Sequence, residues 1–173
     1  MSTVYLALGS NVGDSAAAIE QAVFLLGEKI TNIRQAPLYH SKAAGFTDQP
    51  DFLNTAVCGQ TELTPRELLA FCQATEVAVG RIRRFHWGPR EIDIDILLYD
   101  DLVIDEPDLS IPHARLLERD FMLRPLLDLN PDAQDPRTKQ LLKEVLKSLS
   151  SENTSIIFPP PGDDTSDQTR SRS

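Results

Sequence analysis

Two aspartates separated by one residue are the strongest chemical signal in this chain. Asp93 and Asp95 alternate with isoleucines in a β-branched stretch, residues 92–97. Because successive side chains of a strand point to opposite faces, both carboxylates lie on the same face. Two neighbouring negative charges on a half-buried surface are costly without a cation. Mg²⁺ commonly takes one or two protein carboxylates and completes its shell with substrate phosphates, so the pair predicts a magnesium site.

A cluster of arginines comes just before this strand. It consists of Arg81, Arg83, Arg84 and Arg90, with Trp87 and a Gly-Pro turn between them. The planar guanidinium of arginine can donate two parallel hydrogen bonds to two oxygens of one phosphate. An Asp-x-Asp pair alone is common at strand ends, and an arginine run alone is usually a solvated face. Their combination on one short segment indicates a phosphoryl-transfer site.

Composition restricts the class of protein. The chain has 173 residues, 41% hydrophobic and 25% charged, as expected for a single soluble globular domain. A net charge of -9 argues against a general nucleic-acid or anionic-membrane binder. No stretch approaches the roughly 18 apolar residues of a membrane span, and the N-terminus lacks the basic and apolar regions of a signal peptide. Neither nucleic acid nor membrane is therefore an expected partner.

The two cysteines indicate the compartment. Cys58 and Cys72 form no CxxC and no zinc pattern, and each lies in an apolar context. We expect buried free thiols, which suit a reducing compartment, and therefore a cytoplasmic protein.

The hydrophobic pattern predicts alternating strands and helices. Strands are expected at residues 3–8, within 30–39, at 52–61 and at 92–99. Asp14 or Ser15 can cap a first helix, and Thr64 with Glu67 forms a capping box for a second helix that runs toward residue 79, where Gly80 is placed to end it. Residues 9–14 are expected to form a turn, which lacks the Gly-Lys-Ser/Thr ending of a Walker loop.

This order predicts an α+β fold with a ferredoxin-like βαββαβ core and a mainly antiparallel sheet. A hairpin through Asp100 and Asp101 is expected to add residues 102–104. Two short helices can fill residues 114–127, and residues 138–149 suggest a last amphipathic helix. The domain is expected to span residues 1–149. Residues 150–173, with three consecutive prolines and a polar run, are expected to be a disordered tail.

The segment 84–98, Arg-Phe-His-Trp-Gly-Pro-Arg-Glu-Ile-Asp-Ile-Asp-Ile-Leu-Leu, resembles the signature of the 6-hydroxymethyl-7,8-dihydropterin pyrophosphokinases. Further landmarks agree in order and spacing, at residues 8–11, 48–54, 111–113 and 119–126. The resemblance extends over residues 3–147. It implies transfer of the β- and γ-phosphates of ATP, as one unit, to the hydroxymethyl oxygen of a reduced pterin. AMP leaves, and the product enters folate synthesis.

The resemblance also implies roles for individual residues. Two Mg²⁺ ions are expected on Asp93 and Asp95, and ATP is the co-substrate of an enzyme expected to be a monomer. The implied catalytic residues are Arg81, Arg90, Asp93 and Asp95. The implied ATP contacts are Gln73, Glu76, Arg83, Trp87, Arg90, Ile96, Ser110, His113 and Arg119. The implied pterin contacts are Ser41, Ala44, Phe52, Asn54, Trp87 and Phe121, in which two phenylalanines sandwich the ring and the amide of Asn54 reads its edge.

The chain departs from the family pattern in three places. The loop at 41–45 lacks the prolines of many relatives, and the segment 81–87 is about one residue shorter than in some, which leaves the alignment of Arg84 and His86 open. Asp108 stands where some relatives have a basic residue. Without the family, the phenylalanines would be interpreted as core and Glu76 as a solvated helical residue.

Two other functions remain open from the sequence. One is a catalytically silent homologue that binds pterin or nucleotide, although a binder does not need both metal carboxylates. The other is a two-metal nuclease or nucleotidyltransferase. The acidic net charge and the lack of an obvious third metal carboxylate argue against the latter.

Overall fold

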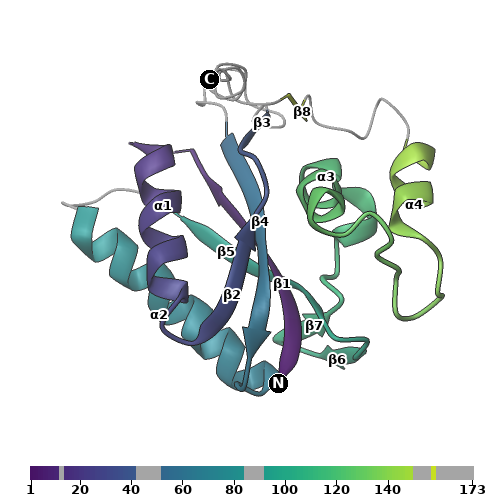
Figure 1. Ribbon diagram of the computed structural model, residues 1–173, viewed down its shortest axis with the longest axis horizontal. Helices are drawn as coiled ribbons and strands as arrows, with labels where there is room; N and C mark the ends of the chain where they lie inside the picture. The colour runs from purple at the N-terminus through teal and green to yellow at the C-terminus, as the bar shows by residue number, and fades with distance from the viewer. Residues whose placement is uncertain (12–13, 42–51, 84–91, 150–156, 159–173) are drawn as a thin grey trace.

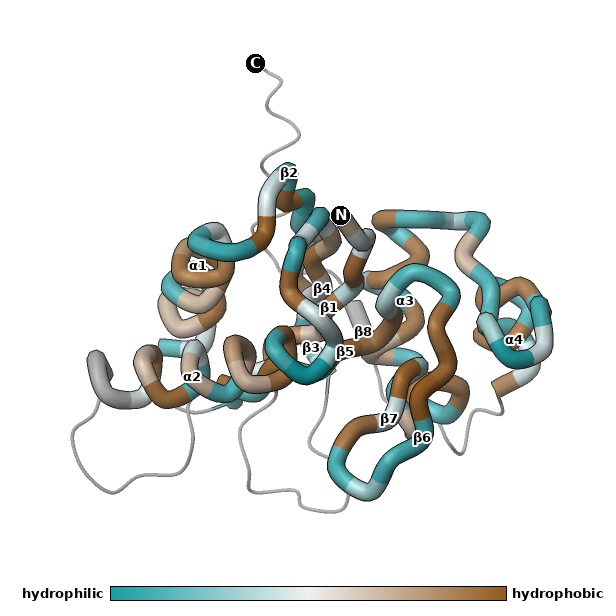
Figure 2. Tube along the Cα trace, turned by 90° about the horizontal axis from the view of Figure 1, so that it is seen from below, coloured by the Kyte–Doolittle hydropathy of each residue, from teal (hydrophilic) through white to brown (hydrophobic). Residues whose placement is uncertain are grey.

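Helices cover both faces of a mainly antiparallel sheet (Figure 1). The computed structural model describes residues 1–11, 14–41, 52–83, 92–149 and 157–158, of which 81–83 and 157–158 are described by their backbone alone. The helices α1 (Ser15–Leu26) and α2 (Pro65–Arg83) lie on one face, and α3 (Asp120–Leu129) and α4 (Leu142–Ser148) lie on the other. Figure 2 shows the same order of layers from below.

The sheet has the strand order of a split βαβ arrangement. Its central strands are β1 (Ser2–Ser10) and β4 (Phe52–Thr61), with β5 (Asp93–Tyr99) beside β1. Both β2 (Ile30–Gln35) and β3 (Tyr39–Ser41) pair with the other edge of β4. Every one of these pairs is antiparallel. The predicted α+β, ferredoxin-like class is therefore confirmed.

Both predicted helix starts are formed by side-chain caps. Asp14 caps α1, because its carboxylate accepts a hydrogen bond of 3.1 Å from the backbone N–H of Ala17. Thr64 and Glu67 form the reciprocal capping box before α2, at 2.9 Å and 3.2 Å. These local signals fix where each helix begins.

Alternation along the strands divides the interior into two layers. Leu6 and Leu8 of β1 pack with the core beneath α1 and α2, and Ile94 and Ile96 of β5 join them. Ala7 and Leu97 face the opposite core beneath α3 and α4, and Leu98 joins that core where the register of β1 and β5 shifts. By this alternation Asp93 and Asp95 lie on the α3 side of the sheet.

Three local predictions were wrong. β1 continues through Gly9 and Ser10, which pair with β4 and extend the strand into the expected turn. α2 continues past Gly80 to Arg83, because a glycine inside a helix costs only about 1 kcal/mol and does not force an end. Asp100 does form a turn, with φ of 49° and reciprocal hydrogen bonds to Thr3, but the described residues that follow it form no strand paired with β5.

The hairpin lies further along the chain. It consists of β6 (Ile104–Glu106) and β7 (Leu109–Ile111), which form a separate two-stranded sheet. A 3₁₀ turn, η1 (Leu116–Glu118), and α3 occupy the region expected to hold two short helices. α4 is shorter than expected and begins at Leu142.

The predicted tail lies mostly outside the described residues. Within it, the backbone of β8 (Ile157–Phe158) pairs with β3. The division into a domain and a disordered tail stays a prediction. In the described part of the chain, every helix is too short or too polar to cross a membrane.

Candidate active site

A cavity of about 210 Å³ lies between the sheet and α3. Its lining comes from segments that are far apart in sequence. These residues are Ala7, Leu8, Gly9, Ser41, Phe52, Asn54, Asp93, Asp95, Arg119, Phe121 and Met122. The cavity therefore brings together the predicted metal carboxylates and four of the predicted pterin contacts.

Small residues on β1 leave the space that forms this cavity. Gly9 pairs with Asp93 of β5 on one side and with Asn54 of β4 on the other. Ala7 is likewise opposite Asp95. Across β5, β1 and β4, the row therefore has the side chain of Asp93 at one end, that of Asn54 at the other and no side chain at Gly9 between them. This leaves the floor of the cavity open between the carboxylates and the amide.

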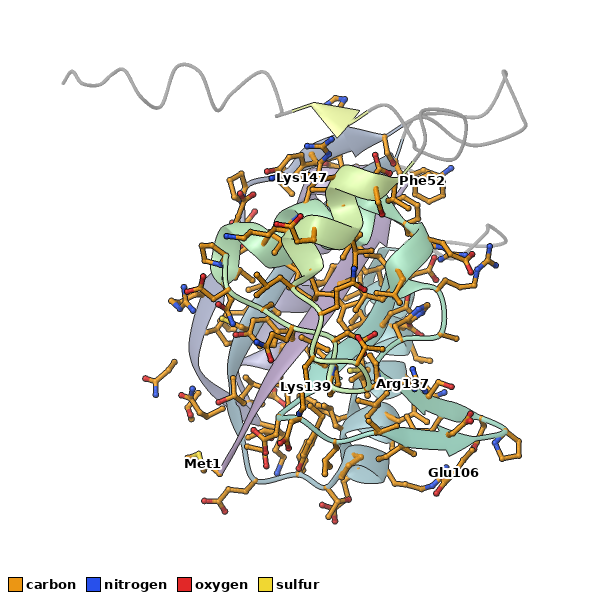
Figure 3. All side chains as sticks on the ribbon, turned by 90° about the vertical axis from the view of Figure 1, so that its right-hand side faces the viewer. Met1, Phe52, Glu106, Arg137, Lys139 and Lys147 are labelled. Atoms are coloured by element: carbon orange, nitrogen blue, oxygen red, sulfur yellow. The ribbon has the colours of Figure 1, made fainter. Side chains whose placement is uncertain are left out.

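The predicted pterin residues form an aromatic and polar end of the cavity. Phe52 lies at the start of β4 and Phe121 at the start of α3, and both are half-buried. Figure 3 shows Phe52 at the end of the molecule opposite to Met1. The buried side chains of Asn54 and Ser41 are joined by a hydrogen bond of 2.7 Å. A flat ring with polar edges needs both kinds of wall.

The two aspartates offer hard oxygen ligands at the other end. Asp93 is exposed and the side chain of Asp95 is 44% exposed. Among the described residues, no group of three or more His, Cys, Asp or Glu side chains could hold a metal ion. A pair of carboxylates beside an open cavity fits Mg²⁺, which fills its remaining positions with phosphate oxygens and water, better than it fits a metal held by protein alone.

A second cavity, of about 310 Å³, adjoins the first. It lies between β5, the β6–β7 hairpin and the segment that follows, and Asp95 lines both cavities. Its other lining residues are Leu69, Ile94, Ile96, Pro107, Asp108, Leu109, Ser110, His113 and Ala114. Three of the predicted ATP contacts, Ile96, Ser110 and His113, therefore share one cavity.

The chain fixes the tautomer of His113. The backbone N–H of Arg115 donates to its Nδ1 at 3.0 Å, so the proton of the neutral ring is on Nε2. That Nε2 is 3.9 Å from Oδ1 of Asp95. Burial lowers the pKa of His113 and outweighs the opposing effect of Asp95, while Arg119 and Arg115 lower it further. His113 thus presents a neutral N–H donor beside the shared carboxylate.

Three other predicted ATP residues lie elsewhere. Glu76 accepts a hydrogen bond of 2.7 Å from the backbone N–H of Ile94, so its carboxylate ties α2 to β5. Gln73, one turn earlier, is exposed and lines neither cavity. Arg119 lines the first cavity, and its guanidinium carbon is 5.5 Å from the centre of the Phe121 ring.

An exposed ion-pair cluster holds the hairpin that forms the second cavity. Arg66, in the first turn of α2, binds Asp108 at 2.8 Å and 3.0 Å and also binds Glu106 at the end of β6. Figure 3 labels Glu106 on the hairpin. The guanidinium of Arg66 lowers the pKa of the Asp108 carboxyl. Asp108 is therefore paired with an arginine of the same chain.

Several predicted site residues lie outside the part of the chain whose side chains the structure describes. Arg81 and Arg83 are described only as backbone within α2. Ala44, Arg84, His86, Trp87 and Arg90 lie outside the described residues. Conversely, sequence reasoning missed Ala7, Gly9 and Met122 as cavity residues. The signal for Gly9 was its place in the Leu-Gly-Ser-Asn landmark, which was interpreted as a turn.

The profile of the family described as 7,8-dihydro-6-hydroxymethylpterin-pyrophosphokinase matches residues 5–131. The chain belongs to this family. It is 46% identical over 154 residues to the 2-amino-4-hydroxy-6-hydroxymethyldihydropteridine pyrophosphokinase of Aquifex aeolicus, covering 89% of this chain and 94% of that protein. The pyrophosphokinase of the same name from Pseudomonas aeruginosa is 40% identical over 141 residues, covering 80% and 86%.

Similar sequences also occur within larger proteins. The bifunctional protein FolKE of Lactococcus lactis is 43% identical over 131 residues, which are 75% of this chain and 38% of that protein. Among solved structures, wild-type HPPK-DHPS of Plasmodium falciparum matches with a TM-score of 0.67 at 16% identity, covering 84% of this chain and 44% of that one. At that identity the match supports the fold alone.

Proposed function

We propose that this pyrophosphokinase transfers the terminal diphosphate of ATP to the hydroxymethyl group of 6-hydroxymethyl-7,8-dihydropterin, for folate synthesis. The observation that carries the proposal is the pair of adjoining cavities with Asp95 in their common wall. The hydroxyl oxygen bonds to the β-phosphorus, and the bond from that phosphorus to the bridging oxygen of the α-phosphate breaks. The hydroxyl proton is lost and AMP leaves.

The first cavity suits the pterin. Phe52 and Phe121 supply apolar ring surfaces, and Asn54 supplies one amide for the polar edge. Ser41 belongs to the same wall. Bound in this way, the pterin would have its hydroxymethyl group near the carboxylate end of the cavity, where the phosphates arrive.

The second cavity suits the nucleotide. Ser110 and the Nε2–H of His113 are donors for phosphate or ribose oxygens, and Ile96 offers an apolar contact. A neutral imidazole donates its hydrogen bond without depending on a protonation event. Asp93 and Asp95 would hold Mg²⁺, which supplies neutralisation of the phosphate charge when bound.

The arginines are proposed to complete the nucleotide site. The helical backbone of α2 reaches Arg83, so the positions of Arg81 and Arg83 extend the helix whose Glu76 is attached to β5. Arg81 and Arg90 match family residues that assist transfer, and Arg83 matches a nucleotide contact. Guanidinium groups there would stabilise charge that develops on the transferred phosphates. Trp87 and Ala44 stay proposals on the family resemblance alone.

One reaction tests the proposal. The full chain is mixed with ATP, Mg²⁺ and the reduced pterin, and the nucleotide products are separated. We expect AMP to form only when pterin is present. Pterin-dependent ADP would show transfer of a single phosphoryl group. Binding of both ligands without AMP would show the silent homologue. Omission of Mg²⁺ tests the metal requirement in the same assay.

We also propose that the enzyme acts in the cytoplasm as a monomer. Both cysteines are free and buried, which fits a reducing compartment. Light scattering of the purified chain measures its mass, and a value near 19.3 kDa is expected. A stable mass of twice that value would contradict the monomer.

A further inference from the structure

An apolar run at residues 156–158 stands out from the rest of the C-terminal segment. It is Ile-Ile-Phe, and every other residue from 150 to 173 is polar, charged, proline or glycine. Isoleucine and phenylalanine favour strands, whereas the three prolines that follow cannot donate backbone hydrogen bonds and therefore end a strand. The composition of this run thus favours a short strand with a defined end.

The structure has a strand at this run. The backbone of β8 pairs antiparallel with β3, and Ile157 is opposite Ser41 while Phe158 is opposite His40. Figure 1 shows β8 beside β3, at the edge of the sheet. Without β8, the outer edge of β3 would present unpaired backbone N–H and C=O groups. Sequence pattern and strand pairing therefore agree on the same residues.

The strand β3 is held by different elements at its two ends. Its inner edge pairs with β4 along all three of its residues. At one end, the hydroxyl of Tyr39 donates a hydrogen bond to the carboxylate of Asp128 on α3. At the other end, His40 and Ser41 are the residues that pair with β8. β8 therefore restrains the end of β3 that lies away from the Tyr39 contact.

The end of β3 that β8 restrains is the end that forms the first cavity. Ser41 lines this cavity, and Phe52, opposite Ser41 on β4, lines it as well. A hydrogen bond of 2.7 Å joins the side chains of Ser41 and Asn54. A strand of three residues has few ladder hydrogen bonds, so pairing along a second edge supplies a large share of those that fix it. A shift of Ser41 would therefore disturb the wall that all three residues form.

We infer that β8 is a positioning segment for the first cavity, so that ligand affinity there depends on the C-terminal part of the chain. The inference rests on the proposed function, in which this ligand is the pterin. β8 acts through β3, by keeping the wall in place before the ligand arrives. The nucleotide side should not share this dependence, because β5, which lines the second cavity, forms the opposite edge of the sheet.

The test removes the backbone donors of β8 from the full chain. In the double variant Ile157→Pro with Phe158→Pro, neither residue can donate a ladder hydrogen bond. We expect the KM for 6-hydroxymethyl-7,8-dihydropterin to rise by about fivefold, the size of one net backbone hydrogen bond. Because the effect is on the pterin wall alone, kcat and the KM for ATP should stay unchanged.

A matched control separates this effect from the presence of two extra prolines. Asp164→Pro with Thr165→Pro makes the same change in the polar part of the same segment and should leave every constant unchanged. Hydrogen exchange reads the pairing without activity. The amides of residues 39–41 should exchange faster in the β8 variant than in the control, and those of β5 should not change. The single variant Ile157→Pro should show the same effects at smaller size.

Each outcome decides the matter. Equal pterin KM values in the β8 variant and the control, with or without faster exchange of β3, would overturn the inference, as would equal rises for pterin and ATP. Unfolding of both β8 variants, seen by circular dichroism, would overturn it too, because a positioning segment leaves the fold intact.

The same experiment distinguishes failure of the inference from failure of the proposed function. Binding of 6-hydroxymethylpterin to each variant is measured by titration calorimetry alongside turnover. A wild type that forms no AMP, together with weaker pterin binding in the β8 variant alone, would contradict the proposed function and support the inference. Normal AMP formation with equal constants in the β8 variant and the control would contradict the inference alone.

Discussion

In the first cavity the polar side chains are buried and bonded to each other, whereas in the second they are carried by an exposed hairpin. Asn54 and Ser41 are nearly inaccessible and belong to the paired strands β4 and β3. The side chain of His113 is 20% exposed, and the hairpin before it is attached through Arg66, which is itself 51% exposed. The first cavity is thus suited to selecting a rigid ring by shape and hydrogen bonds. The second is suited to a flexible ligand that binds through hydrogen bonds to Ser110 and His113 and, as proposed, through a cation on Asp95.

Asp95 belongs to both cavities, and its loss should have the largest effect. Asp95→Asn should lower turnover by roughly 10²–10³-fold or more, because the Mg²⁺ that the carboxylates are proposed to hold would supply several kcal/mol of charge stabilisation. Asp93→Asn should behave alike. Circular dichroism should show an intact fold in each variant, and Asp101→Asn, in an exposed turn, serves as the control. Near-normal turnover of either variant at ordinary Mg²⁺ would contradict the metal role.

Phe121 distinguishes the two cavities by ligand. Phe121→Ala should weaken pterin binding by roughly tenfold, since stacking on one ring is worth on the order of 1 kcal/mol beyond area burial. ATP binding should change little, because Phe121 lines only the first of the two cavities. Phe24→Ala, at a position that is 76% exposed, is the matched control. Equal losses for both ligands would mean that Phe121 acts only as part of the core beneath α3.

Arg66 tests the second cavity in the same way, with a smaller expected effect. Arg66→Gln frees the hairpin and should raise the KM for ATP by less than about fivefold, because exposed ion pairs contribute little. The KM for pterin should stay constant. Arg124→Gln, exposed on α3, is the control. A raised KM for pterin alone would contradict the assignment of the hairpin to the nucleotide side.

The same ion pair predicts a pH dependence. Arg66 lowers the pKa of Asp108 below its ordinary value of 3.8. The stabilisation of the folded state by this ion pair is therefore complete at pH values above 3.8 and is lost as the pH falls through the lowered pKa of Asp108. The difference in thermal midpoint between wild type and Arg66→Gln should persist at neutral pH and narrow in strong acid. A difference that grows on acidification would have the wrong sign.

Local features of this protein could be predicted from sequence, and contacts between distant segments could not. The capping box of Thr64 and Glu67 spans one helical turn, and the shared face of Asp93 and Asp95 needs only the period of a strand. The opposition of Gly9 and Asn54 depends on the register of two strands that are more than forty residues apart. Gly80 does not end α2, because a glycine inside a helix costs only about 1 kcal/mol and is a weak stop signal.

The family resemblance supplied what local pattern could not. Phe52 and Phe121 come from a strand and a helix on different layers, and no periodicity relates them. The resemblance assigns Arg119 to ATP, and this role stays a prediction; its side chain lies beside Phe121 and lines the first cavity, which shares Asp95 with the second. Its position follows from where α3 begins, at Asp120, which is a property of this chain's own packing.

The last prediction, with the smallest expected effect, concerns the rates at which the two buried cysteines are labelled. These rates compare how readily the two sides of the sheet open. Cys58 is buried under α3, on the side of the first cavity, and Cys72 lies on α2 itself, buried in the core between α2 and the sheet. Burial raises the pKa of Cys72 to about 12, with Glu76 and Asp95 adding to the rise. At pH 8 only about one thiol in ten thousand would be the reactive thiolate at that pKa, so labelling of Cys72 requires the layer to open.

Pulse labelling with N-ethylmaleimide and mass spectrometry therefore reports local opening. We expect neither cysteine to react in the folded protein within minutes, and both to react at once in denaturant. Over hours Cys72 should react before Cys58, because Cys72 lies on α2, whose first turn is joined to the hairpin by exposed ion pairs. ATP with Mg²⁺ should slow Cys72 selectively, and pterin alone should not. Faster labelling of Cys58 would reverse the proposed order of rigidity between the two cavities.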